Sequence, residues 1–200
     1  MSIDIIKRYY IKDGLSAREI GNKLGKTTWQ IIRLMKRNNI PRRTPAATQK
    51  IQFYRKPLTF SYKERLSTEE KTLFEIGLML YWAEGVKSGN HIVDFANSNE
   101  RMVLIFLTML RSIYQVKEDK LRVLLYCYAN QNAFFLKKYW SVKLNIPQSK
   151  FIKPYIRQDF DKRKIHKMPF GLVHIRYHDK KLFMRIQENI DIIASRVLKS

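Results

Sequence analysis

The sequence predicts an α+β protein of two domains, in which a helical domain precedes a domain of alternating helices and strands. The first forty residues contain three short segments with apolar residues at helical spacing. Beyond residue 66, segments of helical periodicity alternate with β-rich runs. Hydrophobic residues make up 45% of the 200 residues, which is enough for a sizeable core. We expect a three-helix domain at 1–40, a basic linker at 41–66 and a second domain at 67–200.

The charge of the chain points to a polyanionic partner. Lys and Arg number 39 against 17 acidic residues, which gives a net charge of +22. Such an excess destabilises a compact chain by self-repulsion unless an anionic partner screens it. We therefore expect double-stranded DNA as the partner, with an anionic membrane surface as the second candidate.

Three further features bear on the compartment of the protein. The longest apolar run, Ile76 to Ala83, is far shorter than the roughly 20 residues that a membrane span needs. Met1 to Tyr10 lacks the apolar centre of a signal peptide. The single cysteine, Cys127, excludes an internal disulfide and a cysteine-based zinc cage. We expect a cytoplasmic protein without membrane association, bound to the nucleoid if the source is bacterial.

The N-terminal domain is expected to consist of three short helices. The first covers residues 3–12. The second opens with the capping box Ser16-Ala-Arg-Glu19 and ends before Gly25, which allows a tight turn. The third covers about 27–38, with a threonine as its N-cap.

This pattern resembles the helix-turn-helix family of DNA-binding proteins. Ile20 and Leu24 lie one turn apart in the second helix, Gly21 is small where the two helices would cross, and Ile31 anchors the third helix. The resemblance implies that residues 27–38 form a recognition helix in the major groove. Its outward residues, which we expect to contact DNA, are Thr28, Trp29, Gln30, Arg33, Lys36 and Arg37. The alternative is a plain three-helix bundle with a solvated basic face.

The start of the linker carries two adjacent arginines between prolines, in the segment Pro41-Arg42-Arg43-Thr44-Pro45. The prolines favour an extended backbone. Arginines on such a segment enter a narrow minor groove or follow phosphates, so we expect Arg42 and Arg43 to bind DNA. The alternative is a solvated basic tether.

The second domain is expected to alternate helices with strands. The predicted order is a helix at 67–84, a strand and a helix within 92–110, a strand at 121–128, a helix at 132–144, strands at 151–156 and 171–177, and a helix at 180–197. In the strand at 171–177, His174 and Arg176 lie on one side and Val173 and Ile175 on the other. Asp94 is expected to face water.

The helix at 67–84 is apolar on all sides, which predicts that its own domain covers part of it and another molecule the rest. Gly77 costs about 1 kcal/mol within a helix, and close approach of another backbone explains its presence. Gly77, Tyr81 and Glu84 share a face. Because the helix C-terminus disfavours a carboxylate unless a cation is bound, we expect a homodimer packed through Gly77 and Tyr81, in which the two Glu84 carboxylates share a divalent metal.

The order of Glu84-Gly85, a strand, Asn97-Ser98 and an apolar helix resembles the LAGLIDADG homing endonuclease family over roughly 69–195. The resemblance implies an antiparallel saddle-shaped sheet on duplex DNA, with helices on one face. It also implies that Glu84, as the acid closing the motif helix, is the catalytic ligand of Mg²⁺. The sequence departs from the family in three ways: the Gly77-Leu78 pair lies two residues further from the acid, Glu replaces Asp, and one motif is present, so that cleavage would need two chains.

The segment between the last two strands is strongly basic. We expect it to act as a phosphate clamp, because lysine and arginine at the edge of a DNA-binding sheet neutralise phosphates. Its expected DNA-binding residues are Arg157, Lys162, Arg163, Lys164 and Lys167.

Three functions remain open from the sequence. The first is a sequence-specific DNA endonuclease that acts as a homodimer with Mg²⁺. The second is a DNA-binding transcriptional regulator built on the same fold without catalysis. The third is a peripheral membrane protein held by charge alone.

Overall fold

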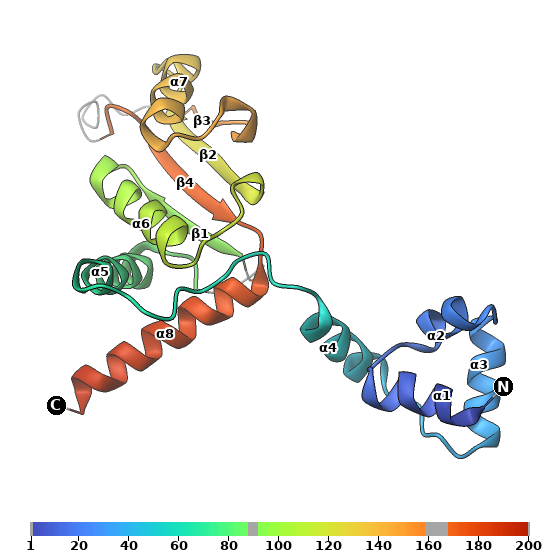
Figure 1. The fold of residues 1–200 in the computed structure, drawn as a ribbon. Helices are drawn as coiled ribbons and strands as arrows, with labels where there is room; N and C mark the ends of the chain where they lie inside the picture. The colour runs from blue at the N-terminus through green and yellow to red at the C-terminus, as the bar shows by residue number, and fades with distance from the viewer. Residues whose placement is uncertain (1, 88–91, 159–167, 200) are drawn as a thin grey trace. The chain divides into compact units, whose positions relative to one another are not determined.

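The computed structural model describes residues 2–87, 92–158 and 168–199. The chain forms two compact units, Met1–Pro57 (the N-terminal unit) and Leu58–Ser200 (the C-terminal unit). Figure 1 shows the first as helices alone and the second as a sheet with helices, so the predicted α+β class is confirmed.

The N-terminal unit contains the three expected helices and a fourth. The elements are α1 (Ile3–Lys7), continued by the π-helical turn η1 (Arg8–Lys12), α2 (Ala17–Leu24), α3 (Thr28–Arg37) and α4 (Pro45–Arg55). The capping box of Ser16 and Glu19 is present. Gly25 has φ 62°, the left-handed conformation that ends α2. A Cβ atom at Gly21 would lie 2.5 Å from the carbonyl oxygen of Lys26, so the turn into α3 needs glycine there.

The segment 41–66, predicted as a linker, is helical in part. Residues 45–55 form α4, which Thr44 caps and Pro45 begins. This helix lies against the turn at Gly14, where an added Cβ atom would come within 2.6 Å of Ile51. Arg55 donates to the Gly14 carbonyl and pairs with Glu19 at 3.1 Å. The sequence concealed these contacts because they join residues about forty positions apart.

The C-terminal unit follows the predicted order of elements. They are α5 (Thr68–Glu84), β1 (Val93–Asn97), α6 (Glu100–Ser112), η2 (Glu118–Lys120), β2 (Leu121–Tyr128), α7 (Ala133–Leu144), η3 (Gln148–Lys150), β3 (Tyr155–Arg157), β4 (Leu172–Tyr177) and α8 (Lys180–Leu198). Polar side chains cap four of these helices: Ser67 caps α5, Asn99 caps α6, Asn132 caps α7 and Asp179 caps α8.

The sheet has the strand order β1-β4-β2-β3. β4 runs antiparallel to β1 and β2, but β3 runs parallel to β2. The predicted wholly antiparallel sheet is therefore wrong, and the sheet is mixed. The reason is that α7 lies between β2 and β3 and carries the chain back to the starting end of β2, as a parallel pair requires. After α5, Gly85 forms an isolated antiparallel bridge with Phe95.

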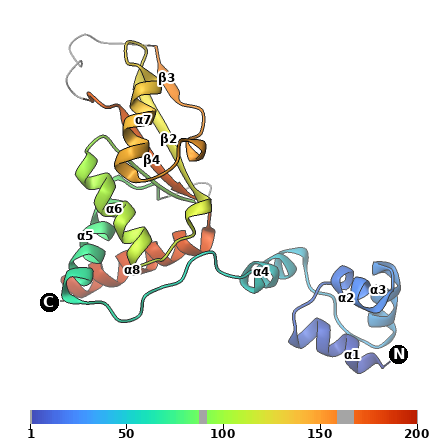
Figure 2. The ribbon, with the colours of Figure 1, turned by 45° about the horizontal axis from the view of Figure 1, so that its top comes forward.

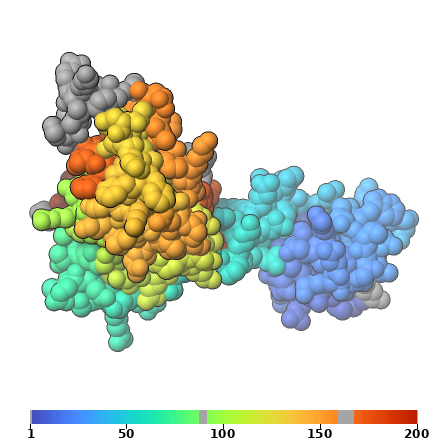
Figure 3. Space-filling model, turned by 90° about the horizontal axis from the view of Figure 1, so that it is seen from above, coloured from blue at the N-terminus to red at the C-terminus, as the bar shows by residue number. Residues whose placement is uncertain are grey.

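The two faces of the sheet have different chemistry. One face supplies the core with apolar side chains that pack on the helices: Val93, Phe95, Leu121, Val123, Leu125, Cys127, Val173, Ile175 and Tyr177. Figures 1 and 2 show α5, α6 and α7 on one side of the strands. From above, residues around α7 form the near surface of the C-terminal unit (Figure 3).

None of the described helices has the length and hydropathy required to span a membrane.

Candidate nucleic-acid interface

The outer face of α3 is basic and exposed. Capping by Thr27 fixes where the helix begins, and burial of Ile31 and Met35 turns the opposite face outward. All six residues predicted there are exposed: Thr28, Trp29, Gln30, Arg33, Lys36 and Arg37. The Arg33 guanidinium lies 5.2 Å from the ring centre of Trp29, which is 64% exposed. This cation–π contact holds a planar cation at the surface of the helix.

The structure changes the role predicted for Gln30. Its side-chain carbonyl accepts a hydrogen bond of 3.0 Å from the Thr27 backbone amide, which completes a capping box. Reading adenine needs both the oxygen and the nitrogen of a glutamine amide. Because the oxygen is bound within the chain, Gln30 is a capping residue in this conformation and not a bidentate base reader.

The two linker arginines have separate roles. Arg42 is exposed, as expected for a phosphate contact. Arg43 is instead built into the N-terminal unit: its guanidinium lies 4.0 Å from the ring centre of Tyr10 and donates to the carbonyl of Leu15. Its backbone amide donates to the Tyr10 hydroxyl at 2.8 Å. These contacts engage the Arg43 side chain within the N-terminal unit, so the predicted DNA contact by Arg43 would need the side chain to rearrange.

The predicted dimer contacts of α5 are also wrong. Gly77 is buried against Met109 of α6 in the same chain, and Tyr81 is fully buried and stacked on Phe106 at 5.5 Å. Burial raises the pKa of the Tyr81 hydroxyl, which donates to the carbonyl of Val86. Close approach at Gly77 does occur, as predicted, but the partner is α6. A glycine shows that something packs closely and does not identify the neighbour.

Glu84 ends α5 and is exposed. Within the described ranges 2–87, 92–158 and 168–199, no three His, Cys, Asp or Glu side chains gather as a metal site. A lone exposed carboxylate offers one of the several oxygen ligands that Mg²⁺ takes. The residues described for one chain thus do not fit the Mg²⁺ site expected around Glu84.

A row of charged side chains crosses the sheet on the face turned away from the core, and the sequence did not single it out as a site. Asp94 of β1 pairs with Arg176 of β4, and Arg176 pairs with Arg122 of β2. Asp94 Oδ2 accepts from Arg176 Nε at 2.7 Å, and Asp94 Oδ1 lies 2.8 Å from His174 Nδ1. The alternation in 171–177 correctly placed His174 and Arg176 on one side, but their partner lies 80 residues away.

Asp94 is buried, with 4% exposed, so the expectation that it faces water is wrong. Burial by itself would raise the pKa of its carboxyl group. The hydrogen bond with His174 and the charges of His174 and Arg176 outweigh burial, and the net pKa of Asp94 is lowered. The carboxylate is therefore ionised at neutral pH and holds both neighbours in place.

Aromatic rings continue the row toward the sheet edge. The Tyr126 ring lies 4.8 Å from His174 and 4.7 Å from Tyr155 of β3. Arg157 pairs with Tyr128 at the end of β3 and is exposed, so it lies at the edge of this face. We call this set the arginine face: Arg122, Tyr126, Tyr155, Arg157, His174 and Arg176. The predicted phosphate-clamp residues Lys162, Arg163, Lys164 and Lys167 lie outside the described residues.

The chain matches no known family. Comparisons with protein-family models, with curated proteins and with solved structures all found no match. Chemistry therefore has to be inferred from the residues themselves.

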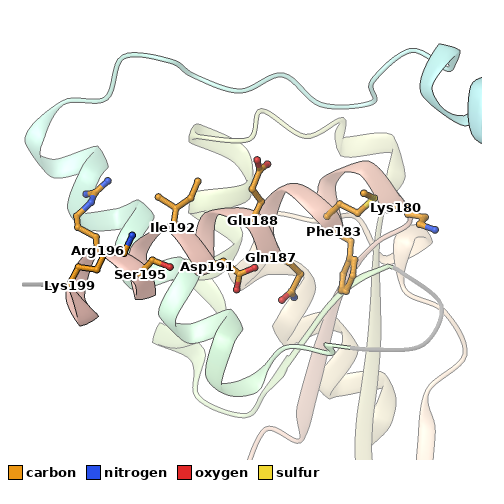
Figure 4. Close-up of a pocket in the computed structure, with 10 residues that line it drawn as sticks. Lys180, Phe183, Gln187, Glu188, Asp191, Ile192, Ser195, Arg196 and Lys199 are labelled. Carbon is orange, nitrogen blue, oxygen red and sulfur yellow. The ribbon is translucent and has the colours of Figure 1, made fainter.

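A large groove of about 940 Å³ runs along α8, and its lining residues come from this helix and its C-cap, Lys199 (Figure 4). Its lining includes the cations Lys180 and Arg196, the anions Glu188 and Asp191 and the apolar Phe183 and Ile192. A polyanion would meet two carboxylates in the middle of this groove. The arginine face and α3 are better suited to nucleic acid.

Proposed function

We propose that the chain binds double-stranded DNA in a sequence-specific manner. The observation that carries this proposal is the pairing of Arg122 with Arg176 across β2 and β4 on the face of the sheet opposite the main core. Like charges directly opposite each other destabilise a sheet. One carboxylate, Asp94, serves this row. An anionic partner on this face removes the repulsion that remains.

The hydrogen bonds of Arg122 also support the proposed DNA binding. In the described part of the chain its guanidinium donates to the backbone carbonyls of Asp119 and Leu121, and not to a carboxylate. Among the residues that the structure describes, no carboxylate therefore neutralises its charge. Together with the net charge of +22, it favours a partner that carries many negative charges.

The N-terminal unit supports the same function by a second surface. A short helix follows a tight glycine turn and presents Trp29, Arg33, Lys36 and Arg37 outward. This is the arrangement in which helix-turn-helix proteins place a recognition helix in the major groove. Two independent basic surfaces on one chain suit a long duplex target.

We further propose a homodimer formed through the outer side of α5. Ile76 and Ala83 are exposed and Leu80 is half-buried, and their spacing places all three on one stripe of the helix. Ile76 remains 44% exposed, which is unusual for an isoleucine in the middle of an apolar helix. A second copy of the stripe is the apolar partner that fits it. We do not propose cleavage, because no metal donor set accompanies Glu84 among the described residues.

Salt-dependent binding tests the proposal. The full chain is titrated with random-sequence duplex DNA at several salt concentrations, alongside anionic phospholipid vesicles of equal charge. Each phosphate contacted should contribute about −0.9 to the slope of log K against log salt. A slope of several units, with duplex bound more tightly than vesicles, is expected. Equal or tighter binding to vesicles at every salt concentration would instead support the membrane alternative.

A further inference from the structure

We infer that Arg176 reads a guanine base and that Asp94 is the residue that positions it. This inference rests on the proposed DNA binding and extends it to a base. It starts from the direction of the Asp94–Arg176 contact. Asp94 binds the Nε side of the guanidinium at 2.7 Å. Within the described residues, the two terminal Nη groups have no acceptor, so the forked end of Arg176 is available.

That forked end has the geometry a guanine requires. Guanine presents two acceptors, O6 and N7, on its major-groove edge, and a bidentate arginine is the commonest contact to them. A flexible arginine loses rotamer freedom when it makes such a contact. Here the buried Asp94 carboxylate and the strand pairing of β1 with β4 fix the side chain in advance. The Arg176 side chain nevertheless keeps 23% of its surface exposed.

His174 binds the other oxygen of the same carboxylate. Asp94 is ionised and accepts only, so His174 donates from Nδ1. This bond and the bond from Arg176 together fix the orientation of the carboxylate. The proposed ligand is thus a duplex step that contains guanine, presented through the major groove.

A purely structural role for the ion pair of Asp94 and Arg176 explains its position less well. The contact lies on the face of the sheet opposite the main core, and it places Arg176 opposite the like-charged Arg122. An ion pair on α8 serves for comparison: Arg185 pairs with Glu188 at 2.9 Å. This pair supplies a matched control for loss of an arginine.

The test is selection from a randomised duplex DNA library by the full-length wild type and by the variants Arg176→Ala, Arg176→Lys, Asp94→Asn and the control Arg185→Ala. Thermal melts followed by circular dichroism establish that each variant is folded; Arg176→Lys keeps the charge where Arg176→Ala proves unstable. The wild type is expected to select a motif with one guanine whose replacement weakens binding about 5- to 150-fold. Arg176→Ala should lose the preference at that position alone, and Arg176→Lys should weaken it there, because lysine reaches the same acceptors without the planar fork. Asp94→Asn should reduce it there, and Arg185→Ala should leave it unchanged.

The outcomes separate this inference from the function on which it rests. If the wild type binds no duplex, the proposed function fails and the inference fails with it. If the wild type selects a motif that the Arg176 variants also select in full, only the guanine contact is overturned. A uniform loss of affinity, with a salt slope smaller by about 1, would assign Arg176 to a phosphate and also overturn it. An equally tight complex with duplex RNA would also overturn the guanine contact, because the narrow major groove of duplex RNA excludes side chains.

Discussion

Gly77 of α5 lies directly against Met109 of α6. A Cβ atom at Gly77 would come within 2.5 Å of the sulfur and 3.0 Å of the Cβ atom of Met109. Contacts this short are not tolerated, so the two helices approach as closely as they do because position 77 has no side chain. The close approach also turns the Ile76 side of α5 outward.

Gly77→Ala is expected to lower the free energy of unfolding by about 1 kcal/mol. Overpacking costs about 1–3 kcal/mol, and the gain of alanine over glycine within a helix offsets about 1 kcal/mol. Urea denaturation followed by circular dichroism measures the change. When Gly77→Ala is combined with Met109→Ala, which opens space beside position 77, the loss of unfolding free energy should disappear. Equal destabilisation in both backgrounds would show that the two residues are not coupled.

Arg42→Ala and Arg43→Ala are expected to change different properties: the first DNA binding, and the second stability. Loss of Arg43 removes its contacts with Tyr10 and Leu15 and should destabilise the N-terminal unit by about 1.5–3 kcal/mol, as for hydrogen bonds of charged groups. Loss of the exposed Arg42 should leave stability within about 0.5 kcal/mol and reduce the salt slope of DNA binding by about 1. Urea unfolding and salt titration distinguish them. A stable Arg43→Ala protein with weakened DNA binding would restore the original expectation for Arg43.

Glu84→Gln is expected to leave stability and DNA affinity nearly unchanged. Glu84 is exposed and, in the described part of the chain, its carboxylate has no hydrogen-bond partner. Removal of one negative charge should tighten DNA binding slightly, if at all. Fluorescence anisotropy with a labelled duplex measures affinity. Incubating plasmid with wild type and Mg²⁺ gives the decisive contrast: cuts that disappear in Glu84→Gln would establish the nuclease that we do not propose.

Asp94→Asn is expected to destabilise the chain at neutral pH by about 1.5–3 kcal/mol, because the charge-assisted bonds to His174 and Arg176 are weakened. The folded pKa of Asp94 is lowered, so its carboxylate contributes stability at pH values above its unfolded value of about 3.9. The contribution is lost as the pH falls below that value and through the folded pKa.

The difference in unfolding free energy between wild type and Asp94→Asn, measured in urea from pH 7 to pH 2.5, should therefore narrow below about pH 4. Other carboxyl groups with a lowered pKa, such as Glu19 and Glu100, are present in both proteins and cancel in the difference. A gap that stays constant over this range would mean that the Asp94 charge does not stabilise the fold.

Ile76→Glu is expected to convert the proposed homodimer to a monomer, because it places a charge within the apolar stripe of α5. Sedimentation velocity with and without duplex DNA measures the change. The control is Phe134→Glu on α7, an apolar residue that is 73% exposed and lies on another helix. A wild type that sediments as a monomer even when duplex is supplied would remove the basis for the dimer.

Local signals made most of the helices and strands predictable. The capping boxes at Ser16 and Ser67 and the strand at 121–128 lie where the sequence placed them, because these features depend on neighbours within a few residues. The same local patterns did not predict α4. Ile51 of this helix lies against the Gly14 turn, and without that distant contact the segment resembles a basic tether.

The same distinction between local and distant contacts applies to the candidate site. The exposed residues of α3, such as Arg33 and Lys36, were predictable because helical spacing alone decides which side of an anchored helix faces outward. The arginine face was not. Asp94 meets Arg176 across 82 positions of sequence, and pairing of β1 with β4 decides that they touch.

The sequence by itself determined the helices other than α4, most of their caps, the order of the strands along the chain and the positive charge, since each follows from composition or from contacts within one or two turns. Only the tertiary structure decided that α6 fills the space beside Gly77, that Arg43 is held inside the N-terminal unit, that β3 runs parallel to β2, and that Asp94 is buried. Each of these depends on which distant surfaces exclude water together, and a local pattern carries no information about its distant partner.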